Sequence, residues 1–194
     1  MSLFEMYIKL GFEHIADTNS YDHILFIITL CAVYSLKQWK NVLILVTAFT
    51  VGHTTTLALA TLNIIKFPSE IIEFLIPVTI FITAIGNFFQ KTLTVSNKLH
   101  LFKYSTALFF GLIHGLGFSN YLHSLIGNEG SIIMPLFYFN LGVELGQLFI
   151  VSCIIACTYL IVDYLKVIRR EWNLILSGAG FGVSIVLILD RFPF

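Results

Sequence analysis

Long apolar stretches alternate along this chain with short polar breaks or breaks that contain proline or glycine. The stretches predict six membrane-spanning helices, at residues 21–36, 41–62, 70–90, 104–126, 132–162 and 172–189. Residues 3–15 are too short to span a bilayer, and we expect a short interfacial or re-entrant helix there, with seven spans as the alternative count. The fifth stretch is longer than a bilayer requires, which predicts tilt or an extension beyond the membrane.

Composition supports the same class of protein. Of the 194 residues, 57% are hydrophobic and 11% are charged, and the mean hydropathy is +0.89, as in polytopic α-helical membrane proteins. No repeat or soluble domain is visible, so we expect an all-α bundle that forms a single transmembrane domain over residues 1–194. The formal net charge of zero offers no basic surface for nucleic acid, which leaves the lipid bilayer and small ions as partners.

The N-terminal residues and the cysteines add two smaller expectations. The first ten residues lack the basic start and the continuous apolar core of a cleaved signal peptide, so we expect them to remain in the mature chain. All three cysteines lie in apolar stretches, which predicts small packing residues and no disulfide framework: Cys31, Cys153 and Cys157.

Basic residues are distributed unevenly between the two sides of the predicted bundle. Eight follow the first, third and fifth spans, and three lie on the opposite side: Lys37, Lys40, Lys91, Lys98, Lys103, Lys166, Arg169 and Arg170, against Lys9, Lys66 and Arg191. The positive-inside rule then predicts that both termini lie outside the cytoplasm, and we expect a multi-pass protein of a bacterial cytoplasmic membrane.

Ionisable residues lie in or beside the apolar stretches, where each is costly unless it is paired, binds a metal or faces a cavity. At the rise of an α-helix, His53, His114 and Glu144 lie about 13 to 18 Å below the outer ends of their spans. The other ionisable groups of this set lie near the outer end of the predicted bundle. We therefore predict one metal site with five ligands: His14, Asp22, His23, His53 and His114. Imidazole and carboxylate ligands suit zinc, nickel, cobalt or iron.

Each of these residues also has a structural explanation. His53 would serve as a helix–helix hydrogen bonder, and the glycines beside His114 would form a packing seam. Asp22 would be a first-turn carboxylate, with Asn19 or Ser20 as the helix cap. We expect the two remaining histidines to be solvated, one in a loop and one near the end of a span: His100 and His123.

Carboxylates and amides near the site predict supporting roles. Glu144 shares a helix face with Asn140 and Gln147. We expect Glu144 to act as a proton acceptor or to support the ligands, and Asn140, Gln147 and Thr54 to orient them. Glu13 is a second carboxylate that would serve as a catalytic base.

Five segments carry a family resemblance: residues 11–15 (GFEHI), 21–26 (YDHILF), 49–57 (FTVGHTTTL), 110–118 (FGLIHGLGF) and 140–147 (NLGVELGQ). In this order, and over nearly the whole chain, they resemble the motifs of the HupE/UreJ family of small membrane proteins. This chain departs from the family pattern at residues 17–20 (DTNS), because a glycine is expected shortly before the Asp-His pair. The departure affects the expected conformation of that turn.

The resemblance implies a hydrogenase or urease accessory protein, or a nickel or cobalt permease, with metalloenzyme maturation proteins as partners. We therefore predict transport or delivery of a divalent transition metal: nickel, cobalt or zinc. The same residues would also serve a zinc-dependent intramembrane hydrolase that acts on a lipid or a peptide, because such an enzyme needs protein ligands, an open coordination position and a carboxylate base. A non-catalytic accessory subunit is the third hypothesis, with residues 91–103 as its partner surface.

The polar groups are also placed unequally across the predicted membrane. They gather in the outer half, and the inner half offers little beyond Thr47, Ser105 and Ser152. Since transport requires a relay of sites from one face to the other, this asymmetry favours a fixed site.

Overall fold

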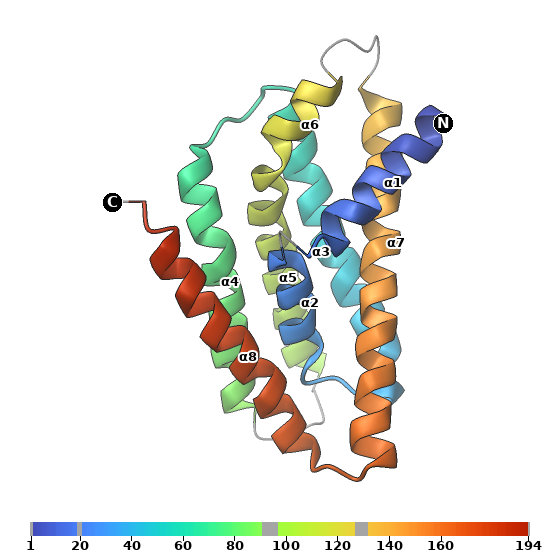
Figure 1. Ribbon diagram of the computed structural model, residues 1–194, viewed down its shortest axis with the longest axis vertical. Coiled ribbons are helices and arrows are strands. Elements are labelled where there is room, and N and C mark those ends of the chain that lie inside the picture. Colours follow the sequence, from blue (N-terminus) through green and yellow to red (C-terminus); the bar gives the residue numbers. More distant parts are fainter. Residues whose placement is uncertain (1, 19–20, 91–96, 127–131, 194) are drawn as a thin grey trace.

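The computed structural model describes residues 2–18, 21–90, 97–126 and 132–193 of the chain. Within these ranges every regular element is helical (Figure 1): α1 (Leu3–Ala16), α2 (Asp22–Cys31), the 3₁₀ turn η1 (Leu36–Gln38), α3 (Trp39–Thr61), α4 (Ser69–Phe89), α5 (Asn97–Gly117), α6 (Ser119–Ile126), α7 (Ile133–Thr158), the π-helical turn η2 (Tyr159–Tyr164) and α8 (Arg169–Asp190). The predicted all-α bundle is confirmed.

Four helical segments of the described chain are long and apolar enough to cross a membrane: Leu36–Thr61, Ser69–Phe89, Ile133–Tyr164 and Arg169–Asp190. They confirm the polytopic helical class, whereas the predicted count of six spans is not confirmed. Helix α5 is not among them, and its first turns carry Lys98, His100 and Lys103. The predicted loop at residues 91–103 is therefore corrected, because α5 begins within it at Asn97.

The first predicted span is much shorter than its apolar stretch. Helix α2 ends at Cys31, and its ten residues extend over about 15 Å, half the thickness of a bilayer core. The apolar stretch continues through buried Val33 and Tyr34 without helical structure. The next turn is then started by Ser35, whose backbone and hydroxyl both donate to Gln38 Oε1 at 3.2 Å. Hydrophobicity thus predicted burial correctly and helix length wrongly.

The fourth and fifth predicted spans are also modified. Residues 104–126 are divided into α5 and α6 around Phe118, where the Ser119 hydroxyl donates to the Leu116 carbonyl at 2.9 Å. Helix α7 continues through the π-helical turn to Tyr164, which agrees with the extension predicted for the long fifth stretch.

The links between helices lie at two opposite ends of the bundle (Figure 1). The link from α3 to α4, which contains Lys66, lies at the upper end of the view. The turn η1, the start of α5 and the link from α7 to α8 lie at the lower end. Lys37, Lys98 and Arg169 thus share the lower end, opposite Lys66. Gly127, which the predicted topology places beside Lys66, is outside the described residues.

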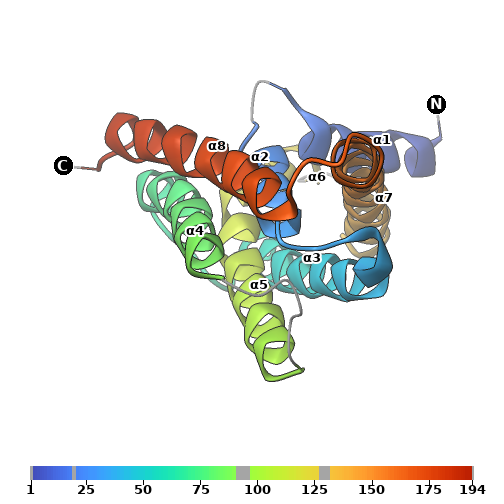
Figure 2. The same ribbon diagram turned by 90° about the horizontal axis from the view of Figure 1, so that it is seen from below.

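Helix α1 descends along α7 and ends near mid-height, where α2 begins (Figure 1). Seen from below, α2 lies in the middle of the bundle, among α3, α4, α5 and α8 (Figure 2). The two short helices therefore place their facing ends inside the protein.

Glycines let two pairs of helices approach to backbone contact. On α5, a Cβ added at Gly111 or Gly115 would collide with the backbone carbonyl of Phe49 or His53 on α3. On α1, a Cβ at Gly11 would collide with the Phe139 carbonyl of α7. Such close seams are typical of helix packing in membranes. The α3–α5 seam positions the helices of His53 and His114, and the α1–α7 seam positions the helix of His14.

A buried polar cluster joins α2, α4 and α8 in the lower half. The Asn87 amide donates to the Thr29 carbonyl at 2.7 Å and to the Ser177 hydroxyl at 3.1 Å. The Asn173 amide donates to the Asn87 carbonyl at 3.3 Å. All four residues are buried. The expectation that this half holds few polar groups was therefore wrong. These groups form hydrogen bonds with one another and hold the three helices together.

Candidate metal centre

Four histidines from four helices meet in the middle of the bundle. His14 lies in the last turn of α1, His23 in the first turn of α2, and His53 and His114 in the second halves of α3 and α5. The potential ligand atoms of His14, His23 and His53 all lie within 4.8 Å of one another. The ring centroid of His114 is 5.1 Å from that of His23. Three of the predicted ligands thus lie close enough to hold one ion, and the ring of His114 lies next to that of His23.

Six of the eight nitrogens of these imidazoles have no hydrogen-bond partner in the described part of the protein. Both nitrogens of His23 and of His53, Nε2 of His14 and Nδ1 of His114 are buried without a hydrogen-bond partner there. Each unsatisfied buried polar group costs about 1–3 kcal/mol. Histidine binds transition metals through a neutral ring nitrogen, so a bound ion would relieve this cost at each ring. The donor set therefore fits a divalent transition metal, and the His53 imidazole forms no helix–helix hydrogen bond among the described residues.

The orientation of His114 is fixed by a threonine that the sequence did not single out. The Thr79 hydroxyl of α4 donates its one proton to the Ile76 carbonyl at 2.7 Å. Thr79 Oγ1 lies 3.0 Å from His114 Nε2 and is placed to accept a hydrogen bond from Nε2 when that nitrogen carries the ring proton. Nδ1 of His114 is left with its lone pair, buried and unpartnered among the described groups. Threonine thus selects the tautomer that presents Nδ1 to an ion, as second-shell groups do in metal sites.

Asp22 lies beside the histidines, outside the group of three close ligands. Its Oδ2 forms an ion pair with Arg191 Nη1 at 3.0 Å. Its Oδ1 is buried and unpartnered in the described structure. Tyr21 occupies the helix-cap position without a side-chain hydrogen bond, and the proposed caps Asn19 and Ser20 are outside the described residues.

A cavity of about 800 Å³ leads to the histidines. Its lining includes His14, His23 and His114 together with an acidic set: Glu13, Asp17, Asp22 and Glu73. Glu13 lies at the exposed rim, with a 3.6 Å contact to Lys9 along α1. Glu73 of α4 is a cavity residue that the sequence analysis missed, because it lies outside the recognised motifs. The acidic lining favours the entry of cations.

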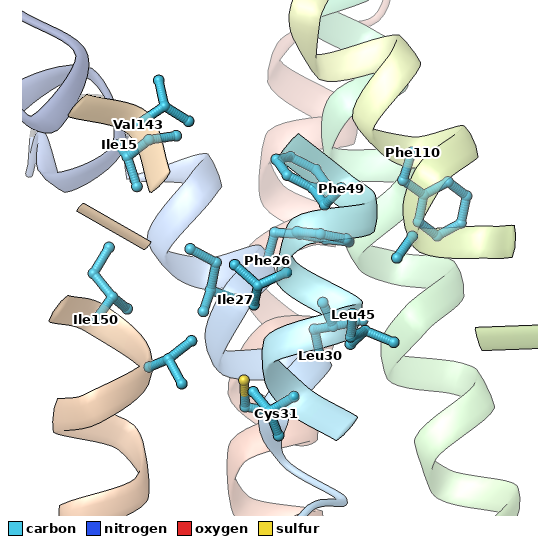
Figure 3. Packing of buried hydrophobic residues seen from close by; sticks show 14 of the residues in the cluster. Ile15, Phe26, Ile27, Leu30, Cys31, Leu45, Phe49, Phe110, Val143 and Ile150 are labelled. Atoms are coloured by element: carbon cyan, nitrogen blue, oxygen red, sulfur yellow. The ribbon is translucent and has the colours of Figure 1, made fainter. Parts of the chain in front are cut away.

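Phenylalanines close the lower side of the histidine cluster. Phe26, Phe49 and Phe110 each lie one helical turn below a histidine of the same helix: His23, His53 and His114. The Phe26 ring centroid lies 5.0 Å from that of Phe49 and 6.1 Å from that of Phe110 (Figure 3). We call these three rings the phenyl floor. The cavity lining includes three of the histidines, and the three phenylalanines of the floor are not among the residues that line it.

The predicted supporting residues lie along a polar seam between α3 and α7. The hydroxyl of Thr47 donates to Glu144 Oε1 at 2.9 Å, that of Thr50 to Gln147 Oε1 at 2.6 Å, and that of Thr54 to Asn140 Oδ1 at 2.6 Å. Glu144, Gln147 and Asn140 thus bond to α3, the helix that carries His53, and none of them forms a hydrogen bond with an imidazole among the described residues. Their second-shell or catalytic roles stay predictions.

Two expectations about residues away from the site are corrected. His100 lies in α5 and is buried, and its Nε2 lies 3.1 Å from the Asn41 amide nitrogen. Cys153 and Cys157 are exposed on α7, and Cys31 is buried; all three are free thiols. The side chain of His123 is outside the described part of the structure.

Comparison with known proteins places these features in a family. The family model described as HupE / UreJ protein matches residues 1–189. Searches of curated proteins and of solved structures found no match. The matched segment contains all four clustered histidines, the acidic cavity and the polar seam. The chain belongs to the HupE/UreJ family.

Proposed function

We propose that this membrane protein captures a divalent transition-metal ion at His14, His23, His53 and His114 for transport or delivery across a bacterial cytoplasmic membrane. The observation that carries the proposal is the convergence of buried, unpartnered imidazole nitrogens at the end of an acidic cavity. Imidazole-rich sites suit nickel, cobalt and zinc. The family itself points to a membrane protein with a metal-related accessory or transport role.

The direction of entry follows from the shape of the cavity and from the charges. The cavity is lined by exposed Glu13 and by three of the histidines, and the end of the bundle below the phenyl floor carries the excess of basic residues. The positive-inside rule assigns that lower end to the cytoplasm. The ion would therefore enter from the extracytoplasmic side, on which both termini lie.

Cysteine labelling tests this orientation. In a background with Cys153 and Cys157 replaced by serine, Lys66→Cys should react with a membrane-impermeant maleimide in intact cells. Lys37→Cys should react only after permeabilisation, because the positive-inside rule places that end in the cytoplasm. Labelling of position 37 but not of position 66 in intact cells would reverse the topology.

Metal analysis and transport together test the function. Purified protein loaded with Ni²⁺, Co²⁺ or Zn²⁺ should retain about one ion per chain after desalting, as expected for one four-ligand site. In proteoliposomes with a trapped metal-sensitive dye, the wild type should admit the ion, and His23→Gln should neither retain nor admit it. Absence of bound metal at micromolar concentrations would contradict the proposal.

A zinc-dependent hydrolase is the second candidate, favoured by the phenyl floor. A site that is open above and closed below holds an ion in place, and the carboxylates of Glu13 and Glu73 line the space where a substrate would lie. In this case the protein would retain zinc firmly and admit none to proteoliposomes. It would instead hydrolyse a lipid ester or a peptide in a zinc-dependent manner.

A further inference from the structure

The ion pair between Asp22 and Arg191 connects the metal centre to the end of α8. Asp22 is the first residue of α2 and directly precedes His23, whereas Arg191 follows the last residue of α8. The Nη1–Oδ2 distance is 3.0 Å, and the side chains are 11% exposed for Asp22 and 26% exposed for Arg191. Arg191 lies beyond residues 1–189, the segment that the family model matches.

Only one of the two carboxylate oxygens of Asp22 takes part in this ion pair. Its Oδ1 is buried with no partner among the described groups, and it lines the cavity together with His23. Arg191 lines the same cavity, so its positive charge lies on the path to the imidazoles. A divalent ion arriving there would be attracted by Asp22 and repelled by Arg191, and low polarity strengthens both interactions.

We propose that Arg191 is a tethered counter-cation that competes with the incoming metal ion for Asp22, so that binding of the ion releases the end of α8. This inference rests on the proposed function, because it requires an ion at the histidines. Arg191 keeps the Asp22 carboxylate neutralised, which limits the cost of a buried charge. The divalent ion takes over that role, and Asp22 turns from an ion-pair partner into a group that stabilises the bound cation.

Arg191 and Phe192 also contact α4. Arg191 Nη1 also lies 3.5 Å from the Glu73 carbonyl, at the limit of a hydrogen bond, and the Phe192 ring packs edge-on against Phe74 at 5.6 Å. Both contacts are with α4. Loss of the Asp22 contact would therefore free α8 from α2 at this point.

A double-mutant cycle tests the competition. Isothermal titration with Zn²⁺ in detergent would compare the wild type, Arg191→Gln, Asp22→Asn and the double variant. Arg191→Gln should tighten zinc binding by about tenfold, within the range common for coupled sites, and Arg191→Lys should remain near the wild type because it keeps the charge. In the Asp22→Asn background, Arg191→Gln should change the affinity less than about twofold, since the shared partner is gone.

Two results would overturn the inference. Weaker binding in Arg191→Gln would show that Arg191 positions Asp22 for the ion. Equal tightening with and without Asp22 would show general repulsion in place of competition. If the wild type binds no zinc, the proposed function and this inference both fail, whereas zinc binding that Arg191→Gln leaves unchanged defeats the inference alone.

A distance measurement provides a readout that is independent of affinity. Spin labels at exposed Leu189 of α8 and at exposed Tyr21, which directly precedes α2, would be introduced in the background without Cys153 and Cys157. Zn²⁺ should broaden the distance distribution in the wild type, and Arg191→Gln should show the broad distribution without zinc. A distribution that zinc leaves unchanged in the wild type would contradict release of the α8 end.

Discussion

Replacement of His53 by leucine is expected to abolish metal binding and to leave the apoprotein at least as stable as the wild type. His53 is 0% exposed, and neither of its nitrogens has a hydrogen-bond partner in the described structure. Removal of such an unsatisfied group recovers part of its cost of about 1–3 kcal/mol. The affinity for Zn²⁺ or Ni²⁺ should fall by more than about 100-fold, because removal of outer-shell partners alone costs 10- to 100-fold.

The two effects require separate measurements. Titration calorimetry gives the affinity, and thermal unfolding in a chelator gives the stability of the apoprotein. His100→Leu is the matched control, because His100 is also buried but lies with Asn41, away from the cluster. It should bind metal like the wild type. An affinity within threefold of the wild type in His53→Leu would exclude His53 as a ligand.

Replacement of Gly115 by alanine is expected to destabilise the protein and weaken metal binding together. The added Cβ would collide with the His53 carbonyl and the Thr56 hydroxyl of α3. A backbone carbonyl cannot rotate away, so α3 and α5 must separate. Overpacking of this kind costs about 1–3 kcal/mol, occasionally more. His53 and His114 lie on these two helices, so the metal affinity should fall by about tenfold or more.

Gly86→Ala is the corresponding control on α4. A Cβ at Gly86 would meet no atom within 4 Å, and alanine is favoured over glycine inside a helix by about 0.5–1 kcal/mol. Gly86→Ala should therefore match or exceed the wild type in thermal stability and bind metal normally. Equal behaviour of the two alanine variants would show that the α3–α5 seam is not under steric constraint.

Much of the histidine cluster could be predicted because an α-helix has a fixed rise. Counting residues from the end of each apolar stretch places His53 and His114 at similar depth, and the cost of ionisable groups in lipid directs them inward. The same reasoning failed for α2, where buried Val33 and Tyr34 continue the apolar stretch without helical structure. Hydropathy measures burial, and it does not distinguish a helix from an extended segment inside a bundle.

The partners of the predicted ligands were beyond the reach of the sequence. Thr79 orients His114 only because α4 packs beside α5, and a threonine in an apolar stretch carries no sign of that role. Arg191 meets Asp22 across 169 positions of the chain, whereas the basic-residue rule assigned it only to a side of the membrane. Such pairings depend on the tertiary arrangement of helices, and no spacing within one helix reports it.

The phenyl floor shares its three helices with three of the four histidines. On α2, α3 and α5, a phenylalanine lies one turn from a histidine, and a rigid helix moves both side chains as one body. Any sliding or tilting of these helices that parts the phenyl rings must also alter the spacing of the imidazoles above them. Among the described residues, a movement that changes the proposed ion site therefore also changes the phenyl floor beneath it.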